Sequence, residues 1–315
     1  MIISVDTGNK LIKTENCEFN SGISILDKMP GEQEEVIEYA GKYYMPTSKR
    51  LSYLEDKTED ERYFILTLFA IARELSYREE CKDISAQEVY EIELLVGLPP
   101  AHYGKLRKSF KEYFYRNGEP IKFCYKNRTY TIAFKEVKVY IQAYAAYCLL
   151  SAKKQLSALP KVLMIDIGGF TVDYMLLRYG RLEIEHVDSL ENGVICLYNN
   201  IKASIRQKYS ILLEEEDIDN IILERATNYS KDLKERVREV AIGYVKELLG
   251  TFRELGIDFR TTQTVFLGGG SILISAFIPI VWKENGGEYC IINDTKANAK
   301  GYRMQYLIEK KGERK

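Results

Sequence analysis

Residues 3–13 read ISVDTGNKLIK and residues 163–173 read LMIDIGGFTVD, and these two stretches decide the fold. In each of them an apolar strand reaches an aspartate, and a second strand-like segment follows after a short turn. Asp6 of the first stretch aligns with Asp166 of the second. Because the two copies head the two halves of the chain, they predict a duplicated α/β domain with a ligand held between the copies.

The turns that follow the aspartates contain Gly8 and Gly168 at matching positions. In a Rossmann or P-loop protein such a turn leads into a helix, whose N-terminus binds phosphate. Here residues 171–180, TVDYMLLRYG, continue as a strand. The pattern therefore predicts that phosphates are held by backbone N–H groups of two β-hairpins, which glycine allows to come close.

The two aspartates also suit a magnesium ion that accompanies a nucleoside triphosphate. Magnesium keeps several of its waters and uses few carboxylates. We expect Asp6 and Asp166, one in each hairpin, to hold the hydrated ion from both sides.

Composition bounds the remaining possibilities. A chain of 315 residues is long enough for two domains, and its net charge of −1 provides no global field to attract DNA. The six cysteines form no CxxC pair, and His102 and His186 are far apart, so a zinc or iron–sulfur site is not expected. Asp6 and Lys10 interrupt any signal peptide, and no apolar run approaches the roughly 20 residues of a membrane span. We expect a cytoplasmic protein that makes no membrane contact.

Several local patterns predict individual elements. Thr58 and Glu61 have capping-box spacing, which predicts that a helix starts there. Lys126–Asn127 is predicted to be the centre of a hairpin, and a helix is expected from about Ile272. The helix around residues 104–117, GKLRKSFKEYFYRN, carries a basic face that we interpret as solvent-facing.

The chain resembles the actin/Hsp70 ATPase superfamily and, within it, the ParM/StbA-like bacterial plasmid-segregation actins. Five segments carry the resemblance and together span nearly the whole chain. They are VDTGNKLIK (5–13, first phosphate motif), IQAYAAYCLLSA (141–152, first connecting helix), IDIGGFTVD (165–173, second phosphate motif), FLGGGS (266–271, adenosine motif) and TKANAKGY (295–302, second connecting helix).

This resemblance implies a duplicated actin-like (ribonuclease H-like) α/β ATPase fold, with two domains and a nucleotide cleft between them. Domain I is expected over residues 1–157 with a small subdomain inserted at about 19–55, and domain II over 158–296 with a smaller subdomain at about 200–262. Residues 297–315 would form a C-terminal helix that returns to domain I.

The resemblance also implies the site residues. Gln142 would orient the attacking water, and Asp6 and Asp166 would serve catalysis through water-held Mg²⁺. The expected nucleotide-binding residues are Thr7, Gly8, Asn9, Lys10, Lys13, Gly168, Gly169, Phe170, Thr171, Asp173, Gly193, Gly268, Gly269 and Ser271. Lys13 is the expected β-phosphate contact, whereas Lys10 serves either phosphate or solvent. Ala297, Asn298 and Gly301 match the second connecting helix. Lys208 and Glu215 are candidates for gripping the base by position alone, so ATP versus GTP stays open.

The implied function is a polymerising protein whose filaments separate plasmid copies, with slow ATP or GTP hydrolysis timing filament turnover. Its expected partners are further copies of itself and a DNA-binding adaptor of the ParR type, which would contact centromere-like plasmid DNA on its behalf. One alternative is a small-metabolite kinase of the same superfamily, in which Asp173 would be the base. Another is a non-hydrolysing actin-fold scaffold.

Overall fold

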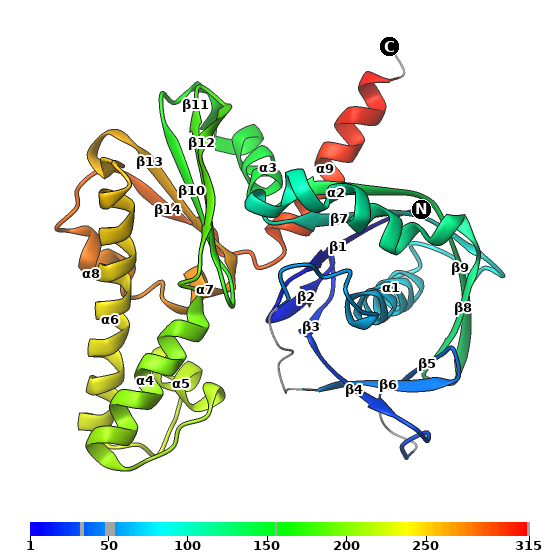
Figure 1. Cartoon of the computed structure of the whole chain (residues 1–315), viewed down its shortest axis with the longest axis horizontal. Coiled ribbons are helices and arrows are strands. Elements are labelled where there is room, and N and C mark those ends of the chain that lie inside the picture. The colour runs from blue at the N-terminus through cyan, green and yellow to red at the C-terminus, as the bar shows by residue number, and fades with distance from the viewer. Residues whose placement is uncertain (32–34, 48–53, 155, 314–315) are drawn as a thin grey trace. The chain divides into compact units, whose positions relative to one another are not determined.

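The computed structural model describes residues 1–31, 35–47, 54–154 and 156–313. These residues divide into two compact units (Figure 1). The first unit comprises Met1–Lys153 together with Lys296–Lys315, and the second comprises Lys154–Thr295.

The first unit is built on one mixed sheet of strands in the order β3-β2-β1-β7-β9-β8-β5-β6-β4. Its strands are β1 (Ile2–Thr7), β2 (Leu11–Lys13), β3 (Glu18–Asn20), β4 (Gly22–Leu26), β5 (Ile37–Tyr39), β6 (Lys42–Thr47), β7 (Tyr90–Leu98), β8 (Ile121–Tyr125) and β9 (Arg128–Ile141). Its helices are α1 (Arg62–Glu80), α2 (Pro100–Tyr115), α3 (Tyr144–Lys154), which runs to the unit boundary, and α9 (Ala297–Gly312), with a short 3₁₀ helix η1 (Arg116–Gly118).

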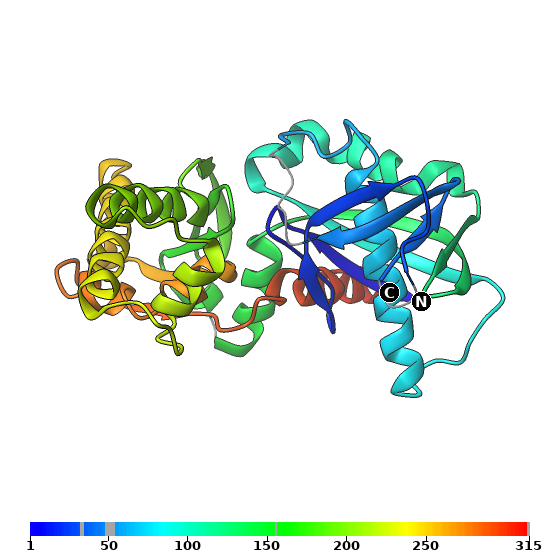
Figure 2. The same cartoon turned by 90° about the horizontal axis from the view of Figure 1, so that it is seen from below.

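The strands of this sheet curve around α1, which is buried along most of its length (Figures 1 and 2). Strand β7 shows why both faces of the sheet are covered. Its Leu94 and Val96 join the main core with α1, whereas Leu95 points to the other face and packs with Tyr302 and Tyr306 of α9. Since successive side chains of a strand alternate between faces, a strand buried on both sides reads as a continuous apolar run.

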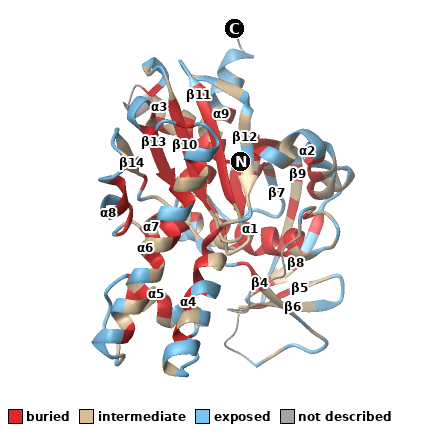
Figure 3. Cartoon of the chain, turned by 60° about the vertical axis from the view of Figure 1, so that its left-hand side comes forward, coloured by how far each residue is buried: buried red, intermediate tan, exposed pale blue. Residues whose placement is uncertain are grey.

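The second unit has a five-stranded sheet in the order β12-β11-β10-β13-β14. Its strands are β10 (Val162–Ile167), β11 (Val172–Arg178), β12 (Arg181–Leu190), β13 (Gln263–Leu267) and β14 (Tyr289–Ile291). Its helices are α4 (Val194–Tyr209), α5 (Glu215–Ile222), α6 (Lys231–Glu254), α7 (Gly268–Leu273) and α8 (Ile278–Trp282), with 3₁₀ helices η2 (Leu156–Ala158) and η3 (Phe259–Thr261). Figure 3 shows β10 and β13 as buried strands, while α4 and α6 bury one side and expose the other.

The two units repeat one topology. In the first, β1 pairs antiparallel with β2 and parallel with β7, and β7 pairs parallel with β9. In the second, β10 pairs antiparallel with β11 and parallel with β13, and β13 pairs parallel with β14. The order β3-β2-β1-β7-β9 thus matches β12-β11-β10-β13-β14. The duplicated α/β fold predicted from the two aspartate motifs is confirmed.

Local predictions have mixed outcomes. The hairpin at Lys126–Asn127 is confirmed, because both residues have positive φ (50° and 60°), as a two-residue type I′ turn requires. The capping box at Thr58 is wrong. Asp56 Oδ1 accepts hydrogen bonds from the Thr58 backbone N–H and hydroxyl, and α1 begins at Arg62. Helix α7 begins at Gly268 instead of near Ile272.

A buried carboxylate fixes the β2–β3 turn onto α1. Glu74 is completely buried; it accepts hydrogen bonds from the Thr14 hydroxyl (2.5 Å), the Asn16 amide (2.6 Å) and Arg78 Nε (2.8 Å). Arg78 also donates to the carbonyl of Ile2 at 2.9 Å. Because Thr14, Asn16 and Arg78 all donate to the one carboxylate of Glu74, this residue joins the β2–β3 turn to α1.

No helix in the described part of the chain combines the length and the apolar character that crossing a bilayer requires.

We expect Glu74→Ala to destabilise the protein by about 3 kcal/mol, because buried Arg78 is left with the longer ion pair with Glu15 (3.7 Å) and Thr14 and Asn16 lose their acceptor. Urea unfolding followed by circular dichroism measures this loss. Glu55→Ala is the matched control, since Glu55 pairs with Lys105 at the surface and such pairs contribute less than about 1 kcal/mol. Equal losses in the two variants would contradict the role given to Glu74.

Candidate functional site

The first hairpin presents Asp6 and Thr7 at the end of β1. Asp6 lies opposite Lys13 in the register of β1 and β2, and Thr7 lies opposite Ile12. Asp6 is 3% exposed and Thr7 is fully buried. A Cβ on Gly8 would lie 2.5 Å from the carbonyl oxygen of Leu11, so the turn between the strands closes only with glycine there.

Gln142 and Asp6 are in direct contact through their side chains. Its side-chain Nε2 donates to Asp6 Oδ1 at 2.7 Å, and its backbone N–H donates to the carbonyl of Leu98 at 2.9 Å. The contact spans 136 positions of sequence and joins the ends of β1 and β9. The structure therefore brings together the residue predicted to orient the attacking water and one of the two residues predicted to hold the hydrated Mg²⁺.

The junction that follows Gln142 is fixed by α9. Ala143 has a φ of 58°, and its backbone N–H donates to Asn298 Oδ1 at 2.9 Å. One turn later, a Cβ on Gly301 would lie 2.4 Å from the backbone of Ala145. The two predicted connecting helices thus meet at close range, and Asn298 fixes the backbone directly after Gln142.

Lys57 is a residue of this site that sequence reasoning missed. It is 5% exposed, and its ammonium donates to the carbonyl of Thr7 and lies 5.0 Å from the centre of the Tyr63 ring. The Tyr63 hydroxyl in turn donates to Asn9 Oδ1 at 2.6 Å. Asn9 is also held through its carbonyl by Ser21 Oγ at 2.5 Å. No motif surrounds Lys57, so the sequence offers no signal for it.

The second hairpin repeats the first residue for residue. Asp166 lies opposite Asp173, and Ile167 lies opposite Val172, so the turn has the same length in both hairpins. Asp173 therefore occupies the position that Lys13 has in the first hairpin. Its carboxylate accepts a hydrogen bond from Ser189 Oγ at 2.5 Å and is 6% exposed.

The start of α4 orients the peptide groups of this turn. The carbonyls of Gly168, Gly169 and Phe170 accept hydrogen bonds of 3.0–3.1 Å from the N–H groups of residues 193–195. In a trans peptide the N–H points opposite to the C=O. The N–H groups of Gly169, Phe170 and Thr171 therefore point away from α4. Such consecutive N–H groups form an anion-binding nest.

Gly193 makes this contact possible. A Cβ at this position would lie 2.4 Å from the carbonyl oxygen of Gly169 and 2.5 Å from the carbonyl carbon of Phe170. The part of Gly193 in nucleotide binding stays a prediction, whereas the structure shows that Gly193 packs directly against the turn of the second hairpin.

Helix α7 packs its first turn on the same hairpin. Gly268 has a φ of 87°, and a Cβ there would lie 2.2 Å from Asp166 Oδ1. Gly269 has open space where a Cβ would be. Ser271 is fully buried, and its hydroxyl donates to the carbonyl of Leu267 at 2.5 Å. This bond places Ser271 inside the helix, and Gly268 and Gly269 remain as the candidate nucleoside contacts.

The two candidates for the base lie at the far ends of helices. Lys208 is exposed near the end of α4, with its ammonium 5.3 Å from the centre of the Tyr209 ring. Glu215 is the first residue of α5. Their role with the base stays a prediction.

Each unit, taken by itself, presents residues whose chemistry fits a phosphate with a hydrated magnesium ion. Asp6 in the first unit and Asp166 in the second are buried carboxylates at matching ends of equivalent strands, and the glycine at position 268 keeps a side chain away from Asp166. Among the described residues, no group of three or more His, Cys, Asp or Glu side chains is arranged to hold a metal. Binding through two carboxylates and water is the coordination that magnesium accepts.

Two family models match the chain. The model described as "Actin like proteins N terminal domain" matches residues 5–144, and the model described as "Archaeal actin homologue MreB-like, C-terminal" matches residues 164–278. Together they cover most of both units, and each contains one of the two hairpins. A search of the curated proteins found no significant relative.

Solved structures share the fold over nearly the full length of the chain. An archaeal actin homologue in complex with ADP matches with a TM-score of 0.75 at 14% identity, covering 98% of this chain and 99% of that one. The ParM filament of Clostridium botulinum matches at 0.75 and 17%, covering 96% and 97%. ParM of Bacillus thuringiensis with AMPPNP matches at 0.65 and 12%, covering 98% of each.

The predicted actin-like fold is thereby confirmed. Because actin-like family models match both its N-terminal and its C-terminal parts, and because its fold is that of actin homologues, the chain belongs to the actin-like proteins.

Proposed function

We propose that this chain is a nucleotide-dependent polymerising protein of the ParM kind, which hydrolyses ATP or GTP slowly. One observation carries the proposal: two hairpins of identical register, each with a buried aspartate before a glycine turn. The proposal assigns both hairpins to the phosphates of one nucleotide. Nucleotide binding is supported by related structures, one of which is a complex with ADP and another a complex with AMPPNP.

Gln142 is the residue to which we assign the attacking water. Its Nε2 donates to Asp6, which leaves Oε1 as an acceptor for a proton of that water. Its backbone is fixed on both sides, by Leu98 and by the contact of Ala143 with Asn298, so the amide needs little reorganisation. Catalysis of phosphoryl transfer is mostly positioning and electrostatics, so the proposed reaction needs no strong base. A slow rate follows.

The chain also supplies positive charge and N–H groups for the phosphates. The N–H groups of Gly169, Phe170 and Thr171 point away from α4, and we assign them to phosphate oxygens together with Lys13. Lys57 adds a buried positive charge next to Thr7. Mg²⁺ bound with the nucleotide would neutralise further phosphate charge, and Asp6 and Asp166 would hold it through water.

Filament formation is proposed from the structural relatives. Those described as ParM or Alp filaments share this fold over nearly the whole chain. We further propose that the filaments move plasmid DNA in the cytoplasm, through a DNA-binding adaptor of the ParR type at a centromere-like site. A net charge of −1 supports indirect contact with DNA, since it provides no long-range attraction to the phosphate backbone.

We expect the protein to assemble when Mg²⁺ and ATP or GTP are added, and to remain dispersed without nucleotide, because each nucleotide state favours a different subunit geometry. Light scattering at tens of micromolar protein, followed by negative-stain microscopy, measures assembly. Scattering that stays flat with both nucleotides would overturn the proposed function.

We expect Gln142→Ala to slow phosphate release by about 100-fold, because the water loses its positioning acceptor, while assembly with nucleotide persists. A phosphate-release assay run beside light scattering separates the two effects. Gln207→Ala is the matched control, since Gln207 is an exposed residue of α4. Unchanged phosphate release in Gln142→Ala would remove this residue from its assigned role.

A further inference from the structure

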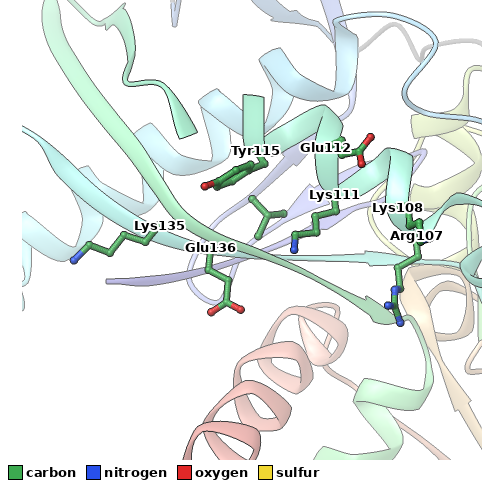
Figure 4. A pocket seen from close by; sticks show the side chains of 8 residues that line it. Arg107, Lys108, Lys111, Glu112, Tyr115, Lys135 and Glu136 are labelled. Atoms are coloured by element: carbon green, nitrogen blue, oxygen red, sulfur yellow. The ribbon is translucent and has the colours of Figure 1, made fainter. Parts of the chain in front are cut away.

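A basic groove lies between α2 and β9 of the first unit, and the function proposed above does not use it. We call it the α2–β9 groove. It encloses about 670 Å³ and is lined by Arg107, Lys108, Lys111, Glu112, Tyr115, Lys135, Glu136 and Val137. In Figure 4, α2 supplies the side chains from Arg107 to Tyr115, and Lys111 lies between that helix and the strand. A second hollow of about 360 Å³ continues it toward Lys138 and Glu309.

The acidic Glu136 and the basic residues of the groove differ in whether they have charged partners. Glu136 already accepts hydrogen bonds or ion pairs from Lys138, Lys310 and Tyr306. By contrast, Arg107, Lys108 and Lys111 are exposed, and within the described residues none of them forms an ion pair. The basic face of this helix, which the sequence led us to interpret as solvent-facing, thus lines one wall of a concave surface.

The chemistry of the groove suits a short acidic segment with an apolar residue. Val137 is itself only 1% exposed, so the half-buried ring of Tyr115 provides the apolar surface of the groove, against which an aliphatic side chain can pack. Glu112 and Glu136 alternate with the cations, and they would repel the uniform charge of a nucleic-acid backbone. A peptide surface whose carboxylates are spaced apart avoids that repulsion.

The second unit carries a surface of this kind. We call residues 211–217, ILLEEED, the acidic tip. They lead into and form the first turn of α5. Leu212 is 76% exposed, which is high for a leucine in a folded unit. Glu214 and Glu216 are exposed, and within the described residues they form no ion pair.

The fold itself accounts for only part of this acidity. Glu214 and Asp217 form a capping box at the start of α5, and acidic residues in a first turn stabilise a helix. Glu216 takes no part in that box. Although Glu216 also lies in the first turn of α5, it leaves the tip, together with the exposed Leu212, with one charged and one apolar group at the surface.

We propose that the acidic tip of one copy of this chain docks in the α2–β9 groove of another copy. This inference rests on the proposed self-assembly and names the surfaces that carry it. Glu216 and Glu214 would face Arg107, Lys108 and Lys111, and Leu212 would pack against the ring of Tyr115. Because the two surfaces differ, the contact is heterologous, and repetition of such a contact builds an open polymer unless the rotation closes a ring.

A charge exchange tests this pairing. Lys111→Glu and Glu216→Lys are purified separately, and each is tested alone and in a 1:1 mixture by light scattering with Mg²⁺ and nucleotide. Each variant alone places like charges together and is expected to lose at least tenfold in assembly rate. In the mixture, alternating copies restore every pair, so assembly is expected to return toward the wild-type rate.

Two matched controls carry the same change of charge elsewhere. Lys122→Glu lies on β8 and Glu247→Lys lies on α6, and both positions are exposed. These variants are expected to assemble as the wild type does. Circular dichroism melts and nucleotide binding verify that Lys111→Glu and Glu216→Lys remain folded and competent.

Each outcome decides the inference. Wild-type assembly by single variants, or a mixture that stays as slow as its components, overturns the pairing and leaves the proposed function intact. A wild-type protein that does not assemble overturns the proposed function and the inference with it. Binding of a DNA duplex that is lost in Lys111→Glu, without a change in assembly, would assign the groove to nucleic acid instead.

Discussion

Burial of an aspartate at the end of equivalent strands is the constraint on which the rest of both units depends. A buried carboxylate is costly unless hydrogen bonds satisfy it. In the first unit Gln142 donates to Asp6, and the backbone after Gln142 is fixed by Asn298. Strand β1, the end of β9 and helix α9 are thereby joined around one charge. In the second unit the glycine turn of α7 closes on Asp166, where any side chain at Gly268 would collide with the carboxylate.

The fold fixes the orientation of the backbone and side-chain groups to which the proposed chemistry is assigned. Carbonyls of the second turn bond to the start of α4, and this directs the N–H groups of Gly169, Phe170 and Thr171 the opposite way. The turn between β1 and β2 is fixed by Lys57 and by the contacts of Asn9 with Tyr63 and Ser21. Rigid N–H groups and a fixed amide are what phosphoryl transfer needs, and the proposed hydrolysis relies on them.

The sequence was sufficient for the hairpins because their signal is local and occurs twice: Asp6 and Asp166 head turns of one length, and the shared register follows. It was insufficient where a residue's hydrogen-bond partner lies far away in the sequence, or where a nearby residue competes for the same hydrogen bond. Thr58 has helix-capping chemistry, but Asp56 is closer and takes its hydrogen bonds. Lys57 and the Asn298 contact join segments far apart in the chain, and no spacing rule predicts them. The basic face of α2 was visible, but only the fold places it opposite β9.

The central claim is that the two hairpins hold the same nucleotide. A double-mutant cycle tests it most directly, using Asp6→Asn, Asp166→Asn and the double variant, with Mg²⁺–AMPPNP affinity measured by isothermal titration calorimetry. If both carboxylates act on one bound ion, each single change weakens binding, and the effects couple by at least about 1 kcal/mol. Additive effects, or affinities equal to that of the wild type, would contradict the claim.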